Sequence, residues 1–86
     1  MPFTTRTKLT QIVIVLVSET FNFEEDRIFV NKPFYEIFGP RVSNLRLARL
    51  TTRLKGELNA NYTGPEIRKK HCVNDVVNLL LPFVAQ

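Results

Sequence analysis

Leucines recur every three or four residues in the second half of the chain, and this repeat constrains the fold more than any other feature. The leucines that form the repeat are Leu47, Leu50, Leu54 and Leu58. A spacing of three and four places side chains on one face of an α-helix. Arginines recur with the same spacing on another face, at Arg46, Arg49 and Arg53. The pattern therefore predicts an amphipathic helix over about residues 43–58 with a basic stripe.

The segment 7–20 is also apolar, and its period favours a second helix. The apolar side chains that share one helical face are Leu9, Ile12, Val13, Leu16 and Val17. The β-branched run 12–15 also suits a strand, so the period alone leaves both structures open. Length favours the helix, because the pattern begins before this run and continues past it. Ile14 and Val15 lie off the main face, and we expect them to be exposed or to cover a neighbouring domain or a second copy of the chain.

Residues 22–38 form a long connection that is unusually apolar. Its apolar side chains are Phe23, Ile28, Phe29, Val30, Phe34, Tyr35, Ile37 and Phe38. Such a connection is expected to pack against the core, because a flexible linker would leave these side chains in water. Loops of this length are usually functional or contain short turns of their own.

A short helix is expected over about residues 65–70. Thr63 and Glu66 have the spacing of a capping box, in which each side chain bonds to the backbone N–H of the other residue. Pro65 suits the start of a helix, because the N–H that proline lacks would have no helical partner there. These three residues together predict a helix start after Thr63.

A last helix is predicted over about residues 74–81. Valines and leucines recur there with helical spacing, at Val73, Val76, Val77, Leu80, Leu81 and Val84. Asp75 falls in the first turn, where the helix dipole favours a negative charge. Pro82 should kink or end the helix. Three long helices, one short helix and a long loop predict an all-α fold, a small four-helix bundle.

Length and composition limit the chain to one small domain without a disulfide. Its 86 residues predict a single domain, 1–86, with a core over about 8–84. Cys72 is the only cysteine, so no internal disulfide forms, and one cysteine with one histidine cannot build a zinc site. The apolar run 12–17 is far too short to span a bilayer. These features favour the cytoplasm and no membrane, and the net charge of +4 mildly favours an acidic partner.

The order of these elements resembles the acyl and peptidyl carrier proteins of fatty-acid, polyketide and nonribosomal peptide synthesis. Residues 19–23 are similar to the end of the family's first helix and the turn after it. Phe34 with residues 38–39 resembles the family's Phe-x-x-x-Leu-Gly before the attachment site. Residues 45–58 resemble its second helix, and residues 72–77 resemble the Thr-Val opening of its fourth helix.

The resemblance covers about residues 8–84, nearly the whole chain. It implies a four-helix bundle of acyl-carrier-protein type, with a long first loop and a short third helix. It also implies a protein that carries or recognises other molecules and is not itself an enzyme. No catalytic or metal-binding residues are predicted, because His71 has no triad partner at a catalytic spacing.

The family attaches 4′-phosphopantetheine to the serine of an Asp-Ser-Leu motif at the start of its second helix. Aligning the leucines of that helix places residues 43–45 over the motif, with Asn44 at the serine position. A carboxamide cannot be the alcohol component of a phosphodiester, so this alignment implies no cofactor. An alternative alignment makes Ser43 the attachment site for 4′-phosphopantetheine, but it loses the Asp and puts Asn44 in an apolar position. We favour the first alignment, which absorbs two extra residues in a loop; Ser43 is also a preferred helix N-cap.

Partner binding is predicted for the second helix, since partner enzymes bind to this helix in carrier proteins. The predicted contact residues are Leu45, Arg46, Arg49 and Arg53. Synthase or transferase-type proteins are the expected partners, and a basic stripe requires an acidic surface on them. The alternative reading of the stripe is an ordinary solvated helix face.

Three functions follow from these observations, in order of preference. The first is a carrier-like recognition or scaffold module without the usual attachment serine. The second is a working carrier modified on Ser43. The third and least favoured is a small basic helical domain that binds nucleic acid, which strong salt dependence of binding would reveal.

Overall fold

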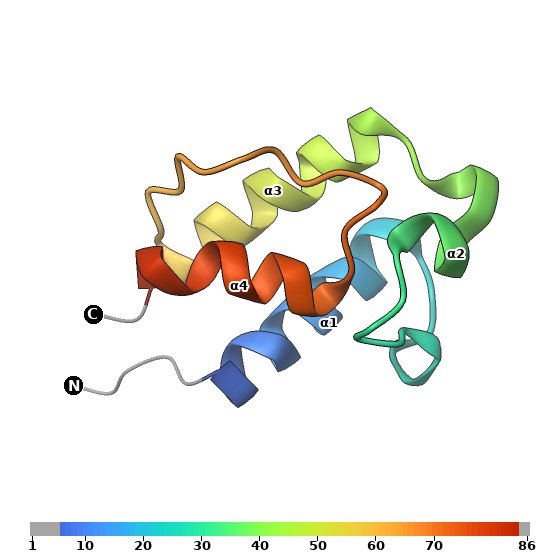
Figure 1. Ribbon diagram of the computed structural model, residues 1–86, viewed down its shortest axis with the longest axis horizontal. Coiled ribbons are helices and arrows are strands. Elements are labelled where there is room, and N and C mark those ends of the chain that lie inside the picture. Colours follow the sequence, from blue (N-terminus) through green and yellow to red (C-terminus); the bar gives the residue numbers. More distant parts are fainter. Residues whose placement is uncertain (1–5, 85–86) are drawn as a thin grey trace.

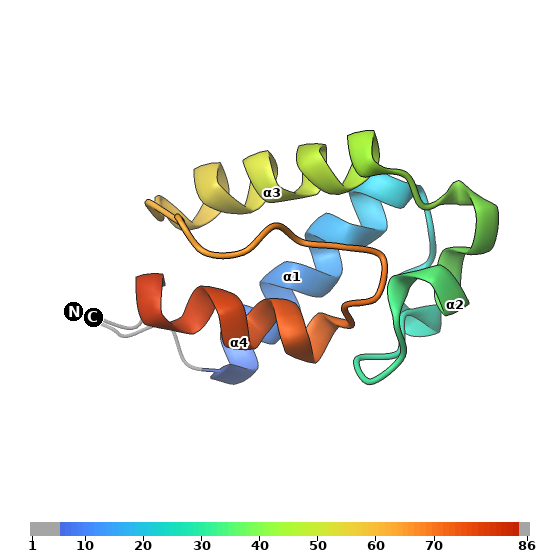
Figure 2. The ribbon, with the colours of Figure 1, turned by 45° about the horizontal axis from the view of Figure 1, so that its top comes forward.

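The computed structural model describes residues 6–84, which form four α-helices, two single-turn 3-10 helices and no β-strand. The α-helices are α1 (Arg6–Phe21), α2 (Phe34–Phe38), α3 (Asn44–Leu58) and α4 (Val73–Val84) (Figure 1). α1 packs against both α3 and α4, and the strap, residues 60–72, runs between α3 and α4 without forming a helix (Figure 2). The prediction of an all-helical fold is confirmed, although the short helix does not lie where the sequence placed it.

α1 is a helix, as its period predicted, and the run 12–15 does not form a strand. Its buried side chains are Leu9, Val13, Leu16, Val17 and Phe21. Ile14 and Val15 are both half-buried. Ile14 packs against the core, and Val15 lines a hollow of about 220 Å³ together with Glu57 of α3. That Ile14 and Val15 contact a neighbouring domain or a second copy of the chain stays a prediction.

α3 confirms the leucine repeat, which faces the core. The buried leucines are Leu47, Leu50 and Leu54, and Leu58 packs half-buried at the edge of the core. The helix stops because Asn59 adopts a left-handed conformation with φ 50° and ψ 43°. Asparagine tolerates this conformation better than other residues with a side chain, so it ends helices readily.

α4 begins one residue before the predicted range 74–81 and ends three residues after it. Cys72 directly precedes the helix, and its backbone N–H donates to Asp75 Oδ2 over 3.1 Å. This bond satisfies one of the donors that a helix start leaves unpaired. Pro82 lies inside the helix and does not end it, so the expected end at this residue is wrong, and the alternative, a kink, stays a prediction.

The predicted short helix over 65–70 is wrong, because residues 65–68 have no regular secondary structure and residues 69–70 form a turn. Tyr62 and Ile67 are both buried and belong to the core. Glu66 does not complete a capping box with Thr63; its carboxylate pairs with Arg68 over 2.8 Å. Burial of two apolar side chains therefore outweighs the local signal for a helix start.

The connection between α1 and α3 is ordered around an aromatic cluster, defined here as Phe21, Phe23, Phe34 and Phe38. Phe38 lies at its centre, stacked on Phe21 with ring centres 4.2 Å apart and meeting Phe23 edge-on at 5.1 Å. The ring of Phe34 lies 6.1 Å from that of Phe38. The prediction that this apolar connection packs against the core is confirmed for six of its eight apolar side chains, whereas it is wrong for Phe29 and Tyr35, which are exposed.

The strap holds α2 in place. The first two backbone N–H groups of α2, those of Phe34 and Tyr35, donate to the carbonyls of His71 (2.9 Å) and Lys69 (3.1 Å). A helix start has no internal acceptors for these groups, so the strap supplies them. The connection and the strap, far apart in sequence, therefore form one surface beside the start of α3.

Gly39→Ala and Gly56→Ala are expected to change stability in opposite directions. Gly39 has φ +56° and ψ −130°, a region that side chains strongly disfavour, so alanine should cost about 1–3 kcal/mol. Gly56 lies inside α3 with open space around it, so alanine should add up to about 1 kcal/mol. Urea unfolding of both variants measures these changes. Equal effects of the two substitutions would contradict the positive φ at Gly39.

Candidate functional site

The start of α3 is the candidate site, and Ser43 caps the helix there. Ser43 is extended, with φ −143° and ψ 158°, and its Oγ accepts a hydrogen bond from the Arg46 N–H over 3.2 Å. Its carbonyl accepts the Leu47 N–H over 3.0 Å, the first bond of the helix. The capping role of Ser43 is confirmed, whereas attachment of a cofactor at Ser43 stays a prediction.

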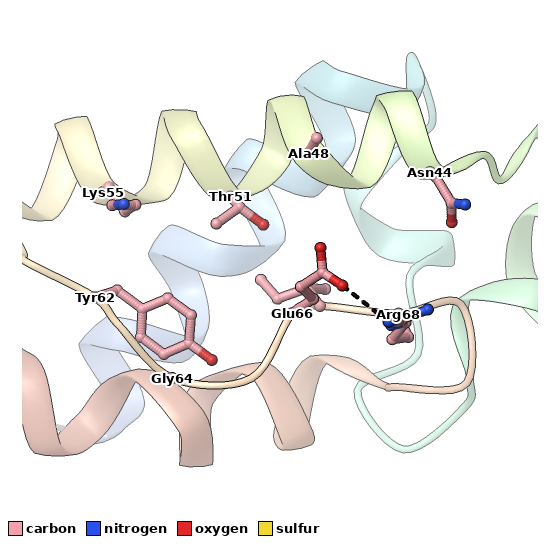
Figure 3. Close-up of a pocket in the computed structure, with 9 residues that line it drawn as sticks. Asn44, Ala48, Thr51, Lys55, Tyr62, Gly64, Glu66 and Arg68 are labelled. Atoms are coloured by element: carbon pink, nitrogen blue, oxygen red, sulfur yellow. Dashed lines mark hydrogen bonds and ion pairs between the residues drawn. The ribbon is translucent and has the colours of Figure 1, made fainter.

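Asn44 is the first residue of α3, and its exposed side chain lies on the side that faces the strap (Figure 3). It borders a groove of about 330 Å³ between α3 and the strap. It also borders a hollow of about 390 Å³ at the helix start, which Ser43, Arg68 and Lys69 line as well. Asn44 is therefore the α3 residue that borders both the groove and the hollow, and Arg68 borders both from the strap.

The groove is lined by both polar and apolar residues. On the α3 side it is lined by Ala48, Thr51 and Lys55, and on the strap side by Tyr62, Gly64, Glu66, Ile67 and Arg68. The Tyr62 hydroxyl donates to the Pro65 carbonyl, and burial raises the pKa of this hydroxyl above its ordinary value. A Cβ on Gly64 would lie 2.6 Å from the Tyr62 ring, so the strap needs glycine there.

His71 has a structural role in the strap. The Nδ1 atom of its imidazole accepts a hydrogen bond from the backbone N–H of Arg68 over 2.8 Å. The backbone N–H of His71 in turn donates to the backbone carbonyl of Arg68 over 3.0 Å. The imidazole thus closes the turn that positions the carbonyls bonded to α2. Because this nitrogen is an acceptor, it carries no proton in the arrangement described.

The arginine stripe of α3 does not form one uniform row. Arg46 is half-buried, with its guanidinium carbon 6.0 Å from the centre of the Phe21 ring. Arg53 pairs with Glu19 of α1 over 3.3 Å. Arg49 is exposed and has no ion pair within residues 6–84. Leu45 is 64% exposed, the largest value among the large apolar side chains described.

Sequence reasoning missed two arginines that lie near an aromatic ring of the connection. Arg27 and Arg41 both place their guanidinium carbons near the ring of Phe23, at 5.5 and 6.0 Å from its centre. They belong to the two 3-10 turns, Glu25–Arg27 and Gly39–Arg41. The sequence offers only a weak signal for this arrangement, namely basic residues scattered through an aromatic-rich connection.

Ser43→Ala is expected to destabilise the protein by about 1 kcal/mol, because α3 loses the side-chain acceptor for the Arg46 N–H. Ser43→Asp keeps an acceptor at this position and adds a favourable charge at the helix start, so it should retain the stability of the original chain. Chemical denaturation of the three proteins measures the difference. A Ser43→Asp variant as unstable as Ser43→Ala would show that the cap contributes little.

No cluster of metal-ligating side chains occurs within residues 6–84. In the same part of the chain, no helix is long and apolar enough to cross a membrane. Comparisons with protein-family models, curated proteins and solved structures find no match to this chain.

Proposed function

We propose that this chain is a carrier-protein-like domain of a fatty-acid, polyketide or nonribosomal peptide type system that lacks the prosthetic group. It serves as a recognition or scaffold module and catalyses no reaction of its own. The observation that carries the proposal is Asn44, an exposed carboxamide at the first position of α3. Carrier proteins have their attachment serine at the start of this helix.

The burial of α3 supports the alignment on which the proposal depends. Leu47, Leu50 and Leu54 are buried when Ser43 is the cap and Asn44 the first helical residue. A shift of the alignment by one residue would move the positions expected to be buried by about 100° around the helix, away from these leucines. The burial of the leucines therefore supports the alignment of residues 43–45 with Asp-Ser-Leu, in which the amide takes the place of the alcohol.

The outer side of α3 is the proposed docking face, defined by Leu45, Arg46, Arg49 and Arg53. Leu45 offers exposed apolar surface, and Arg49 offers an unpaired cation within the described part of the chain. The Arg53–Glu19 pair is exposed on both sides, so a partner carboxylate can compete for Arg53 at little cost. Synthase or transferase-type proteins with an acidic surface are the proposed partners.

Intact-mass spectrometry tests the absence of the prosthetic group. The purified chain is incubated with a promiscuous phosphopantetheinyl transferase and coenzyme A, beside a conventional carrier protein as positive control. We expect no change in the mass of this chain. A gain of one phosphopantetheine unit would refute the proposal.

A working carrier modified on Ser43 is the second candidate, because this serine is exposed beside the hollow at the start of α3. In that case the Ser43 hydroxyl would form the phosphodiester, and the thiol of the arm would carry acyl or aminoacyl groups. The same incubation with Ser43→Ala separates the candidates. Loading of the original chain that disappears in Ser43→Ala would establish the second function.

A further inference from the structure

The groove between α3 and the strap follows a face of α3 that is neither the leucine face nor the docking face. Its α3 wall consists of Asn44, Ala48, Thr51 and Lys55, which recur every three or four residues. Asn44 and Lys55 lie at opposite ends of this row (Figure 3). At a rise of 1.5 Å per residue the row is about 16 Å long, which about five residues of extended chain can span.

The strap wall of the groove has backbone groups without hydrogen-bond partners. The backbone N–H groups of residues 61–64 and 66–67 donate to no acceptor within residues 6–84, and among the carbonyls of residues 61–67 only that of Pro65 accepts a hydrogen bond there. Gly64 has no side chain, so it lines the groove with its backbone. Such groups bond to water or to a partner, and a second extended chain beside them offers matching donors and acceptors.

The charged side chains of the groove place cations at its ends and an ion pair between them. Lys55 lies at one end, and Lys69 lines the hollow that Asn44 borders at the other. Neither lysine has an ion pair within residues 6–84. Between these ends, Glu66 pairs with Arg68 over 2.8 Å (Figure 3). A bound chain would therefore meet unpaired lysines at its two ends, whereas Glu66 would repel a carboxylate in its middle.

We infer that this groove binds an extended segment of a protein partner that has two acidic side chains about five residues apart and neutral residues between them. The backbone of the segment pairs with the strap around Gly64, and its acidic ends meet Lys55 and Lys69. Nucleic acid has a phosphate on every nucleotide and would place negative charge beside Glu66. The inference goes beyond the proposed function, because it concerns neither the docking face nor a prosthetic group.

The spacing of the two carboxylates is tested by NMR titration of the isotope-labelled full chain with two capped hexapeptides of the same composition. The first has glutamate at both ends and neutral residues between, and the second has both glutamates at its centre. We expect saturable shift changes at the amides of Gly64, Glu66 and Ile67 with the first peptide. The second should bind at least about three-fold more weakly, because it loses an exposed charge pair. Equal affinities for the two peptides would overturn the inference.

Variants of equal charge locate the two ends of the bound segment. Lys55→Gln and Lys69→Gln should each weaken binding of the first hexapeptide about two- to five-fold, the range for one exposed charge pair. Lys70→Gln removes the same charge from an exposed residue of the strap that lines neither the groove nor the hollow, so affinity should stay unchanged. A loss in Lys70→Gln as large as in Lys55→Gln would show a general effect of charge and no defined site.

A third hexapeptide tests the pairing of backbones. It keeps the glutamates of the first peptide but has methyl groups on its central backbone nitrogens, which removes donors and leaves both carboxylates in place. Binding should weaken at least about five-fold, the effect of losing about one net hydrogen bond. Undiminished binding of the methylated peptide would contradict a role of the strap backbone.

Coenzyme A and single-stranded DNA are the competing ligands. Either one that saturates the shifts of Gly64 and Ile67 at concentrations where the first hexapeptide does not would replace the inferred peptide as the ligand. The inference also fails if the first hexapeptide produces no saturable shift at these amides. None of these titrations depends on phosphopantetheine loading, which tests the proposed function separately.

Discussion

Replacing Phe38 with alanine is expected to lower the free energy of unfolding by about 3–5 kcal/mol. The Phe38 side chain is only 4% exposed and contacts three other rings, those of Phe21, Phe23 and Phe34. Its removal leaves a cavity where the connection, α1 and α2 meet, and this cavity adds to the loss of buried surface. For a domain of this length, the midpoint of thermal unfolding should fall by at least about 12 °C.

Thermal and urea unfolding, followed by circular dichroism, measure the effect of Phe38→Ala. Phe29→Ala is the matched control, because Phe29 lies in the same connection but is 55% exposed, and its loss should change stability by less than about 0.5 kcal/mol. Phe38→Leu keeps apolar volume but not the stacked ring, so it should fall between the two and remain folded. Similar stability of Phe38→Ala and Phe29→Ala would contradict the central place of Phe38.

The long helices could be predicted from the sequence because one face of each is buried continuously. In α3 every third or fourth residue is a leucine, and the three central leucines face the core. In α1 the ambiguity between helix and strand disappears because Leu9 and Phe21, at opposite ends, are buried together with Val13, Leu16 and Val17 between them. Periodicity over four turns or more is a strong signal, since it reports the burial that stabilises the helix.

The strap could not be predicted from local sequence because tertiary burial decides its conformation. Thr63 and Glu66 form a good capping signal, yet the strap forms no helix, and Tyr62 and Ile67 are buried in the core. The short helix formed instead is α2, whose first N–H groups bond to carbonyls of the strap. A five-residue helix of this kind depends on partners distant in sequence, so its own residues give little indication of it.

The candidate site was predictable where it depends on α3 and not where it depends on tertiary contacts. The cap at Ser43 and the position of Asn44 follow from residue type and from the leucine repeat. The approach of Arg27 and Arg41 to Phe23 does not, because it depends on both 3-10 turns folding around the aromatic cluster. The ion pair between Arg53 of α3 and Glu19 of α1 likewise could not be predicted from the local sequence pattern.

Asn44→Ser is expected to turn the chain into a substrate for phosphopantetheine attachment. The substitution puts an alcohol at the first position of α3, beside the intact cap of Ser43 and with the leucine face of α3 unchanged. The attachment oxygen then stands where the Asn44 amide now borders the groove and the hollow. Serine is a neutral choice near a helix start, so stability should change by less than about 0.5 kcal/mol.

Asn44→Thr serves as a matched variant, because it presents a more hindered alcohol at the same position. We expect slower loading of Asn44→Thr than of Asn44→Ser. The double variant Ser43→Ala, Asn44→Ser should still be loaded, which assigns the attachment to position 44 and not to position 43.

The most direct measurement is the intact mass of the original chain and of Asn44→Ser after the same incubation with transferase and coenzyme A. The account predicts an unchanged mass for the original chain and a gain of one phosphopantetheine unit for the variant. Loading of the original chain would contradict it by showing an attachment site that is already functional. A variant that stays unmodified while the control carrier is loaded would equally contradict the claim that α3 begins as the attachment helix of a carrier protein.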